Sequence, residues 1–326
     1  MDAQNIILKI FQNNKLQKPI KIKAFGSGQI NRVYNIDNQY VVKLEGNVKH
    51  IRGMYAHQAK IIPKLIRKGI CTPEIISYGE IGDCDYLLMR KVEGRNLIFD
   101  WLKFSRAEKE NFIAQIVEQL CIFHSINFSH YAIPVLFNQK FKILDQAILY
   151  TARFDKINRE NFSQKILEKI DFLKKYLKDN QKVLAEEDTA VFVHNDIHFE
   201  NIFYHQNKIS GIIDFDIHCY APRDYELRKI VRFFREPVFH HSIINSELKK
   251  KYSHYRMRWE MSSFRKYYPD LFAHKDLIAR IRLYYLDRIL NILDCYAKSE
   301  DKNFLIKFNQ EFRDIYMGDW LERFLG

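Results

Sequence analysis

The sequence of 326 residues predicts an α+β fold with two lobes, a small antiparallel-sheet lobe at 1–92 and a larger, mainly helical lobe at 93–326. Three observations predict this fold. The first 92 residues contain short segments in which apolar and polar residues alternate, as in strands with one buried face. Most later segments repeat apolar residues at helical spacing. The two patterns meet at a break at 92–94, so we expect a ligand-binding cleft there.

The elements of the small lobe follow from local signals. Apolar residues recur on one face near the N-terminus, which is typical of a short amphipathic helix. Alternating segments separated by turn residues then indicate an antiparallel meander. Pro63 is expected to kink or end the helix that follows the meander. In chain order we expect a helix at 2–12, strands at 20–23, 32–36 and 40–44, a helix at 52–67, and strands at 74–78 and 85–92.

The larger lobe is expected to be helical apart from one β-rich stretch. Ser105-Arg106-Ala107-Glu108 is a capping-box pattern, which predicts a helix that begins there and ends near Ser125. The β-rich stretch, at 190–215, contains apolar strands on both sides of a polar segment. Further helices are expected at 161–185, 223–235 and 274–297.

Composition excludes several classes of protein. A hydrophobic content of 47% excludes intrinsic disorder, and no run of 18 residues is free of charge, which excludes a membrane span. The N-terminus has no signal-peptide pattern, and five widely spaced cysteines favour reduced thiols in a cytoplasmic protein. We therefore expect no membrane partner.

The charge is strongly positive. There are 52 Lys and Arg against 40 Asp and Glu, a formal charge of +12, which suggests a nucleic-acid or anionic-surface binder. However, no zinc-finger, basic-zipper or RNA-binding aromatic pattern accompanies the charge. We therefore interpret it as a solvated surface and expect no nucleic-acid partner; salt-sensitive binding to nucleic acid would favour the alternative.

The strongest chemical signal lies in the β-rich stretch. His194 to Asn201 reads HNDIHFEN, and a second short motif, Asp214-Phe215-Asp216, follows the next apolar segment. We interpret this arrangement as a hairpin that brings Asp196, Asn201 and Asp214 to one end of two neighbouring strands. Phosphoryl transfer needs one carboxylate to accept the proton of the attacking hydroxyl, and a second carboxylate with an amide oxygen to hold Mg²⁺. The spacing matches that of protein-kinase catalytic loops.

The small lobe contains the complement to this motif. Lys43 interrupts the apolar third strand, where protein kinases carry a phosphate-binding lysine. By itself an edge-strand lysine would be the simpler interpretation. Ser27 and Gly28 lie in a Gly-Ser-Gly turn ahead of Lys43, where backbone N–H groups could approach phosphate; an ordinary hairpin turn is the alternative.

These motifs together resemble the aminoglycoside phosphotransferase and choline kinase superfamily of small-molecule kinases, which has a bilobal protein-kinase-like fold. HNDIHFEN is similar to the family's H-G-D-L-H-x-x-N catalytic loop, and 211–216 is similar to its G-x-I-D-F/W-E/D segment. The other similar segments are 25–34, which resembles the nucleotide-positioning loop, and 85–89 with 92–94, which resemble the strand and hinge.

The resemblance implies a role for each matching residue. Asp196 would be the catalytic base, Lys43 the phosphate clamp, and Asn201 and Asp214 the Mg²⁺ ligands. The backbone from Met89 to Lys91 would bind adenine. The cofactors would be ATP, with GTP possible, and Mg²⁺.

Other polar residues near the motifs are open to a structural interpretation. Gln58 occupies the position of the family's lysine-pairing glutamate, so it is expected to hydrogen-bond Lys43 without neutralising it. We expect His198 to form hydrogen bonds within its loop. Asp216 fits a salt bridge or a cap as well as a metal, and Asp224 and Glu226 are interpreted as charges that complement a helix dipole. Four aromatic residues fit either a quaternary-ammonium cage or, as their helical spacing favours, the core: Tyr252, Tyr255, Trp259 and Phe264.

The sequence thus predicts an ATP-dependent kinase that phosphorylates a hydroxyl group of a small molecule. The resemblance makes an aminoglycoside or related antibiotic the first acceptor to consider, with choline, ethanolamine, a sugar or a macrolide as alternatives. A catalytically weak nucleotide-binding regulator is a further alternative, suggested by Gln58. The protein is expected to be a monomer or a homodimer.

Overall fold

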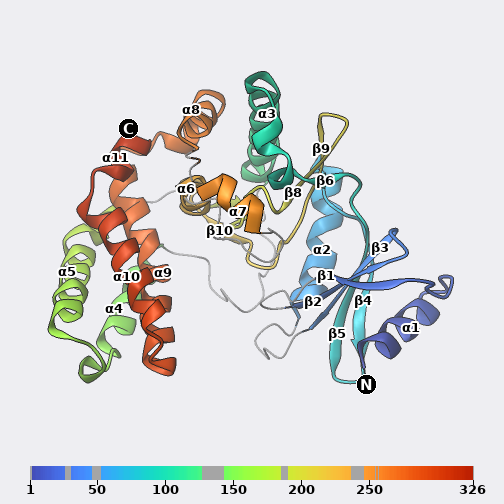
Figure 1. The fold of residues 1–326 in the computed structure, drawn as a ribbon, viewed down its shortest axis with the longest axis horizontal. Helices are drawn as coiled ribbons and strands as arrows, with labels where there is room; N and C mark the ends of the chain where they lie inside the picture. The colour runs from blue at the N-terminus through green and yellow to red at the C-terminus, as the bar shows by residue number, and fades with distance from the viewer. Residues whose placement is uncertain are drawn as a thin grey trace.

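A five-stranded antiparallel sheet lies on one side of the molecule and helices form most of the rest, as the sequence predicts (Figure 1). The computed structural model describes residues 2–25, 31–45, 53–126, 143–184, 190–235, 246–253, 255 and 257–325.

The strand order in the sheet is β1-β2-β3-β5-β4, so most strands that pair in the sheet are also consecutive in the chain. The predicted meander is confirmed, and Lys43 on the third strand lies opposite Val33 on one neighbour and Leu87 on the other. The two further strands are also present, and they pair with each other and with the meander. The strands are β1 (Ile22–Phe25), β2 (Asn31–Ile36), β3 (Tyr40–Glu45), β4 (Ile75–Ile81) and β5 (Cys84–Arg90).

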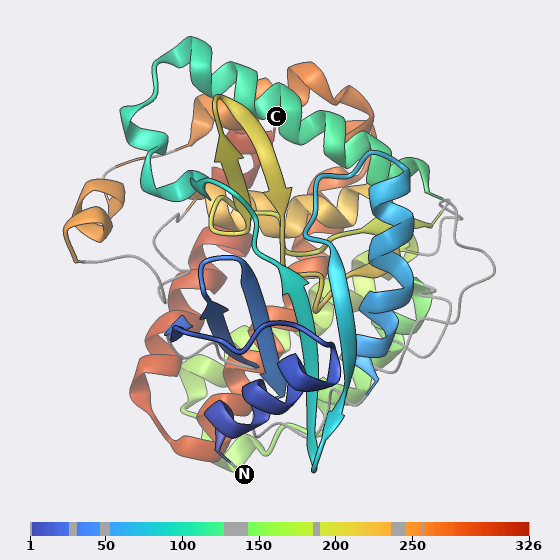
Figure 2. The ribbon, with the colours of Figure 1, turned by 90° about the vertical axis from the view of Figure 1, so that its right-hand side faces the viewer.

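Two helices cover opposite faces of this sheet, α1 (Ala3–Asn13) and α2 (Met54–Arg67). The apolar side of α1 packs with Val42 and Leu44, whereas α2 packs with Leu87. Side chains alternate between the faces of a strand, so Lys43, which lies between Val42 and Leu44, points to the face covered by α2. Figure 2 shows α2 running alongside the sheet.

The helix α2 continues through Pro63, which corrects part of the sequence prediction. The helix runs unbroken to Arg67 although proline lacks the N–H that would bond to the carbonyl of Ala59. Ile61, Ile62 and Leu65 are buried in the core of the molecule. This packing on both sides of Pro63 stabilises helical geometry that the local sequence disfavours.

Nine helices form most of the remainder of the described chain. The capping box at Ser105 is present, with Glu108 donating its backbone N–H to the Ser105 hydroxyl and accepting a bond from the Ser105 N–H. The helices pack around one large apolar core that includes Trp101, Phe123 and Leu286. They are α3 (Arg106–Ser125), α4 (Ile143–Asp155), α5 (Gln164–Asn180), α6 (Leu227–Arg235), α7 (Ser246–Ser253), α8 (Arg258–Tyr267), α9 (Leu277–Ser299), α10 (Lys302–Phe312) and α11 (Trp320–Leu325).

The β-rich stretch forms two small sheets, not one hairpin. β8 (Ile202–His205) and β9 (Lys208–Ile212) form the predicted hairpin, joined by β6 (Arg95–Asn96). β7 (Val191–Val193) instead pairs with β10 (Cys219–Ala221). The expectation that Asp196, Asn201 and Asp214 lie at one end of two neighbouring strands is therefore wrong in detail, because Asp196 follows β7, which belongs to the other sheet.

None of the described helices combines the length and the apolar character needed to cross a bilayer.

Candidate active site

The loop between β7 and β8, residues 194–201, is held in place by a buried carboxylate. Glu226, which is completely buried, accepts hydrogen bonds from the backbone N–H groups of His194 (2.8 Å) and Asn195 (2.9 Å). Asn195 has a positive φ of 66°, a conformation that asparagine tolerates better than most residues. Glu226 therefore acts as an anchor for the loop, which corrects its interpretation as a helix-dipole charge.

Asp224 also departs from that interpretation. Its carboxylate forms a bidentate pair with Arg280 on α9, at 2.6 and 3.0 Å, and both side chains are almost fully buried. Tyr284 adds a hydroxyl bond at 3.2 Å. Asp224 thus connects the turn that precedes α6 to α9 inside the core.

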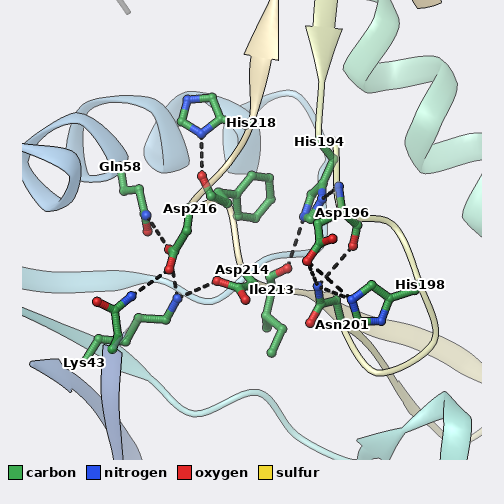
Figure 3. A network of polar contacts seen from close by, with 12 residues as sticks. Lys43, Gln58, His194, Asp196, His198, Asn201, Ile213, Asp214, Asp216 and His218 are labelled. Carbon is green, nitrogen blue, oxygen red and sulfur yellow. Dashed lines mark hydrogen bonds and ion pairs between the residues drawn. The ribbon is translucent and has the colours of Figure 1, made fainter. Parts of the chain in front are cut away.

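The His194 imidazole is fixed as a neutral tautomer. Its Nδ1 accepts the backbone N–H of Asp196 at 3.2 Å, which leaves Nε2 to donate to the carbonyl of Ile213 at 3.1 Å. Burial lowers the pKa of His194, although Glu226 and Asp196 oppose the shift. His194 thereby ties the loop that carries Asp196 to the segment that carries Asp214 (Figure 3).

The carboxylate of Asp196 has two distinct sides. Oδ2 accepts from Asn201 Nδ2 at 3.1 Å and lies 3.4 Å from His198 Nε2. Oδ1 accepts from Lys229 Nζ at 3.1 Å. His198 also contacts Asn201 at 3.0 Å, so the expectation that it bonds within the loop is confirmed.

The segment 214–216 meets the sheet through Lys43. The ammonium group lies 2.8 Å from Asp214 Oδ1 and 3.0 Å from Asp216 Oδ1. Burial disfavours the charge of Lys43, but the two carboxylates outweigh burial and raise its pKa. Asp216 therefore forms a salt bridge, one of the roles that the sequence left open. Asp214 itself has a positive φ of 70°, an uncommon backbone conformation that costs energy.

Gln58 contacts a different partner from the expected one. Its Nε2 donates to Asp216 Oδ1 at 2.7 Å, and Asn31 Nδ2 donates to the other oxygen of Asp216 at 2.7 Å. Gln58 and Lys43 thus both bond to Asp216, in place of the expected bond between them. Burial and the neighbouring Asp214 raise the pKa of Asp216 to about 6 in spite of Lys43.

Asn201 and Asp214 offer the oxygen chemistry that Mg²⁺ prefers. Asn201 and Asp214 are linked through the backbone bond from Ile213 N–H to Asn201 O at 2.9 Å, and Figure 3 shows the Asp214 carboxylate between Lys43 and Asn201. Nδ2 makes the side-chain bonds of Asn201, so Oδ1 is the atom that could take a cation. No group of three or more His, Cys, Asp or Glu suited to a metal occurs among the described residues. One carboxylate and one amide nevertheless fit Mg²⁺, which keeps several waters and phosphate oxygens.

The predicted hinge is packed closely against the small sheet formed by β6, β8 and β9. A Cβ on Gly94, whose φ is +89°, would lie 1.9 Å from the backbone oxygen of Tyr204, so only glycine fits. Met89 is buried against Tyr55, and the Lys91 N–H donates to the carbonyl of Gln39 at 2.9 Å. That amide is therefore already bonded, and a role for 89–91 in adenine binding stays a prediction. Ser27 and Gly28 lie outside the described residues.

The four aromatic residues on and between α7 and α8 pack in or against the core, which favours the core interpretation over an ammonium cage. Tyr252 and Phe264 are buried, and the Tyr252 hydroxyl donates to the carbonyl of Ile98 at 2.6 Å. Tyr255 and Trp259 are partly buried against the same core. Lys109 already lies 5.1 Å from the centre of the Tyr255 ring.

Sequence reasoning missed two residues beside Asp196. Lys229 contacts its carboxylate, and Glu200 is buried with Oε1 lacking a hydrogen-bond partner among the described residues. Burial, aided by Asp196, raises the pKa of Glu200 to about 8. Glu200 lies within the HNDIHFEN motif itself, so its position was visible in the sequence. Lys229 carried no such signal, because it lies in an ordinary amphipathic segment.

Comparison with known proteins identifies the family. The phosphotransferase enzyme family matches residues 21–244, and no curated protein sequence matches the chain. Among solved structures, ADP-bound aminoglycoside phosphotransferase APH(2'')-Ib has a TM-score of 0.67 at 18% identity, over 99% of each chain. The GDP complex of aminoglycoside 2'-phosphotransferase-IIIa has a TM-score of 0.69 at 14% identity, over 97% of this chain and 98% of that one.

A third structure is similar over its whole length. A thermostable mutant of aminoglycoside phosphotransferase APH(4)-Ia, in a ternary complex with ADP and hygromycin B, has a TM-score of 0.67 at 14% identity over 100% of both chains. At these identities the similarity establishes the fold, which is the predicted kinase-like one.

Proposed function

Because the chain belongs to the phosphotransferase enzyme family, we propose that it transfers the γ-phosphoryl group of ATP to a hydroxyl group of a small molecule. The observation that carries this proposal is the convergence of Asp196, Asn201, Asp214 and Lys43 from separate parts of the chain. These are the groups that phosphoryl transfer requires. GTP is the alternative donor.

Asp196 is the base in this proposal. The acceptor hydroxyl donates to Asp196 and its oxygen attacks the γ-phosphorus, while the bond from that phosphorus to the β–γ bridging oxygen breaks. The electron pair of this bond leaves with the nucleoside diphosphate, and the hydroxyl proton passes to Asp196. Asn201 fixes Oδ2 of the carboxylate through its 3.1 Å bond, so Asp196 is oriented before the acceptor arrives.

Lys43 and the metal ligands act on the nucleotide. The Lys43 ammonium, held charged by Asp214 and Asp216, binds phosphate oxygens and orients them towards Asp196. Asn201 and Asp214 would hold Mg²⁺, which offsets the charge of the transferring group when bound.

Aminoglycosides are the first acceptors to test, because the solved structures of similar fold bind nucleotides and aminoglycosides according to their names. Choline, ethanolamine, sugars and macrolides are the alternatives within the same chemistry.

The test is a transfer assay with Asp196→Ala. We expect wild-type protein with Mg²⁺ and ATP to add one phosphate to an acceptor, detected by mass spectrometry, and Asp196→Ala to lose this activity while retaining ATP binding and its unfolding temperature. Transfer by Asp196→Ala at the wild-type rate would contradict the site. ATP binding without transfer to any acceptor would instead favour the regulator.

A further inference from the structure

Lys229 places a positive charge directly at the proposed base. It lies in the first turn of α6, which begins immediately after the anchor Glu226, and its Nζ is 3.1 Å from Asp196 Oδ1. The side chains of Lys229 and Asp196 remain 19% and 17% exposed. The contact is therefore accessible from solvent, as an acceptor approaching Asp196 requires.

The contacts of the Asp196 carboxylate determine which charged group lies beside the acceptor hydroxyl. Oδ2 contacts Asn201 and His198, and Oδ1 contacts Lys229, so an incoming hydroxyl that bonds to Oδ1 approaches on the Lys229 side. A hydroxyl bonded to Oδ1 lies close to the ammonium group, because both share that oxygen. Substituents on the neighbouring carbon atoms of the acceptor then come within a few ångströms of the Lys229 charge.

The surroundings of Lys229 are also basic. Helix α6 carries Arg228, Lys229, Arg232 and Arg235 among its nine residues and no acidic residue. Arg232 lies three residues after Lys229, on the same side of the helix. Burial is the main cause that lowers the pKa of Arg232 to about 10; Arg288 and Arg235 add to this shift and Glu311 opposes it.

Several acidic groups near this helix already have partners. Asp214 contacts Lys43, and Glu226 contacts backbone N–H groups. Glu311 lies between Arg235 and Arg288, at 3.0 and 2.6 Å. Apart from Glu200, these contacts engage the carboxylates that a polycationic acceptor would use, and the Lys229 charge would repel a cationic group beside Asp196.

We propose that Lys229 is a specificity-determining residue that binds a negatively charged group, a carboxylate or a phosphate, carried by the acceptor next to its reacting hydroxyl. This inference rests on the proposed phosphotransfer at Asp196 and narrows its acceptor to anionic alcohols, in place of the aminoglycosides suggested by similarity of fold. The Lys229 ammonium exchanges its bond with Asp196 for the acceptor anion, which releases Oδ1 for the hydroxyl.

A matched series of three-carbon alcohols tests the proposal. Glycerol is neutral, glycerate carries a carboxylate, glycerol 3-phosphate carries a phosphate, and 3-aminopropane-1,2-diol carries an amine. The dissociation constant of each is measured by NMR titration of the full chain saturated with Mg²⁺ and a non-hydrolysable ATP analogue. We expect glycerate or glycerol 3-phosphate to bind at least about 10-fold more tightly than the amine, and comparison of the two anions identifies the preferred group.

Variants of Lys229 assign the preference to this residue. Lys229→Met should remove the discrimination between anionic and neutral alcohols, and Lys229→Arg should retain most of it. Lys178→Met removes the same charge from an exposed position on α5 and should change nothing. Equal unfolding temperatures and equal affinity for the ATP analogue show that Lys229→Met has affected only the acceptor site.

Three results would overturn the proposal. They are failure of both anions to bind the nucleotide-loaded wild type, an unchanged preference in Lys229→Met, and kanamycin binding that Glu200→Gln weakens and Lys229→Met strengthens. Failure of the proposed function is distinguishable, because it appears separately as the absence of Asp196-dependent ATP hydrolysis with water as acceptor. Persistent hydrolysis without anion preference would refute only the role of Lys229.

Discussion

Glu226 shows how one buried residue controls the geometry of the proposed base. Its two oxygens accept the backbone N–H groups of His194 and Asn195, directly before Asp196. Glu226→Gln has only one acceptor oxygen in place of two, so one N–H loses its partner. We expect a loss of about 1.5–3 kcal/mol in the free energy of unfolding.

The same variant should affect turnover more than nucleotide binding. Displacement of the loop misplaces Asp196 but leaves Lys43 in position, so kcat should fall at least about 10-fold while ATP affinity stays within about twofold. Urea unfolding and steady-state transfer kinetics measure both effects, with the exposed Glu247→Gln on α7 as control. Unchanged kcat in a destabilised Glu226→Gln would show that the loop does not depend on this anchor.

Gln58 gives a second prediction, which tests its observed partner. Gln58→Glu replaces the donor 2.7 Å from Asp216 with an anion, beside a carboxyl whose pKa is already raised to about 6. If Gln58 contacted Lys43 instead, the same change would stabilise the protein. We expect a loss of about 1–3 kcal/mol at pH 8, because a buried ionised pair of like charge is costly.

The pH dependence of Gln58→Glu has a defined sign. A carboxyl whose folded pKa is raised takes up a proton more readily in the folded state, so the loss should shrink as pH falls from 8 to 5. Gln58→Met removes the bond without adding charge and should show a smaller loss with little added pH dependence. Urea unfolding of both variants at the two pH values distinguishes these outcomes.

These residues also show what the sequence could establish about the site. The spacing of Asp196, Asn201 and Asp214 is short enough for local motifs to bring them together, and their proximity was predicted. The contact of Lys229 with Asp196 spans 33 residues and depends on how α6 enters the core, which no local pattern encodes. Gln58 was assigned the wrong partner because several polar groups surround Lys43, and only side-chain packing selects among them.

At the scale of elements, Pro63 in α2 gives a clear prediction. Proline in a helix interior removes one hydrogen bond and strains the preceding turn. Pro63→Ala restores the N–H for the carbonyl of Ala59, so it should raise the free energy of unfolding by about 1–3 kcal/mol. Thermal unfolding measures the change, with Lys60→Ala on the exposed side of α2 as control for helix propensity.

Pro63→Ala also shows whether the proline has a functional purpose. Gln58 lies on the same helix, so a change in its curvature would move Gln58 relative to Asp216. A stabilised variant with unchanged transfer rate would show that the proline is incidental. No gain in stability would contradict the assumption that the lost bond is costly here.

Local patterns predicted most elements and few of their pairings. Alternation and capping signals depend on neighbouring residues, so the meander and the helix from Ser105 were found at nearly their observed bounds. β6 and β10, of two and three residues, exist only because partner strands are available. The separation of β7 from the β8–β9 hairpin has the same origin, since sheet membership is decided by tertiary packing.

At the scale of the molecule, the sheet and the helical part are connected through the site itself. Asp216 contacts three residues of the first part of the chain, namely Asn31, Lys43 and Gln58. His57 on α2 stacks on His218 at 5.0 Å between ring centres and 7° between planes. A change of charge in this stack therefore affects the connection between the two parts.

The histidine stack predicts a loss of stability in mild acid. Burial lowers the pKa of both histidines to about 4. The His218 ring and two lysines add to the shift of His57. In the unfolded chain they take up protons near pH 6.5, so the stability that they contribute is fully present above that value and is lost as pH falls towards 4.

His57→Phe keeps a ring against His218 but cannot titrate, so its free energy of unfolding should fall less over this window, by on the order of 2 kcal/mol. Urea unfolding at pH 7 and pH 5 measures the difference, with the exposed His205→Phe as control. If His57→Phe lost as much stability as the wild type, protonation of the stack would not be what weakens the connection between the sheet and the helices.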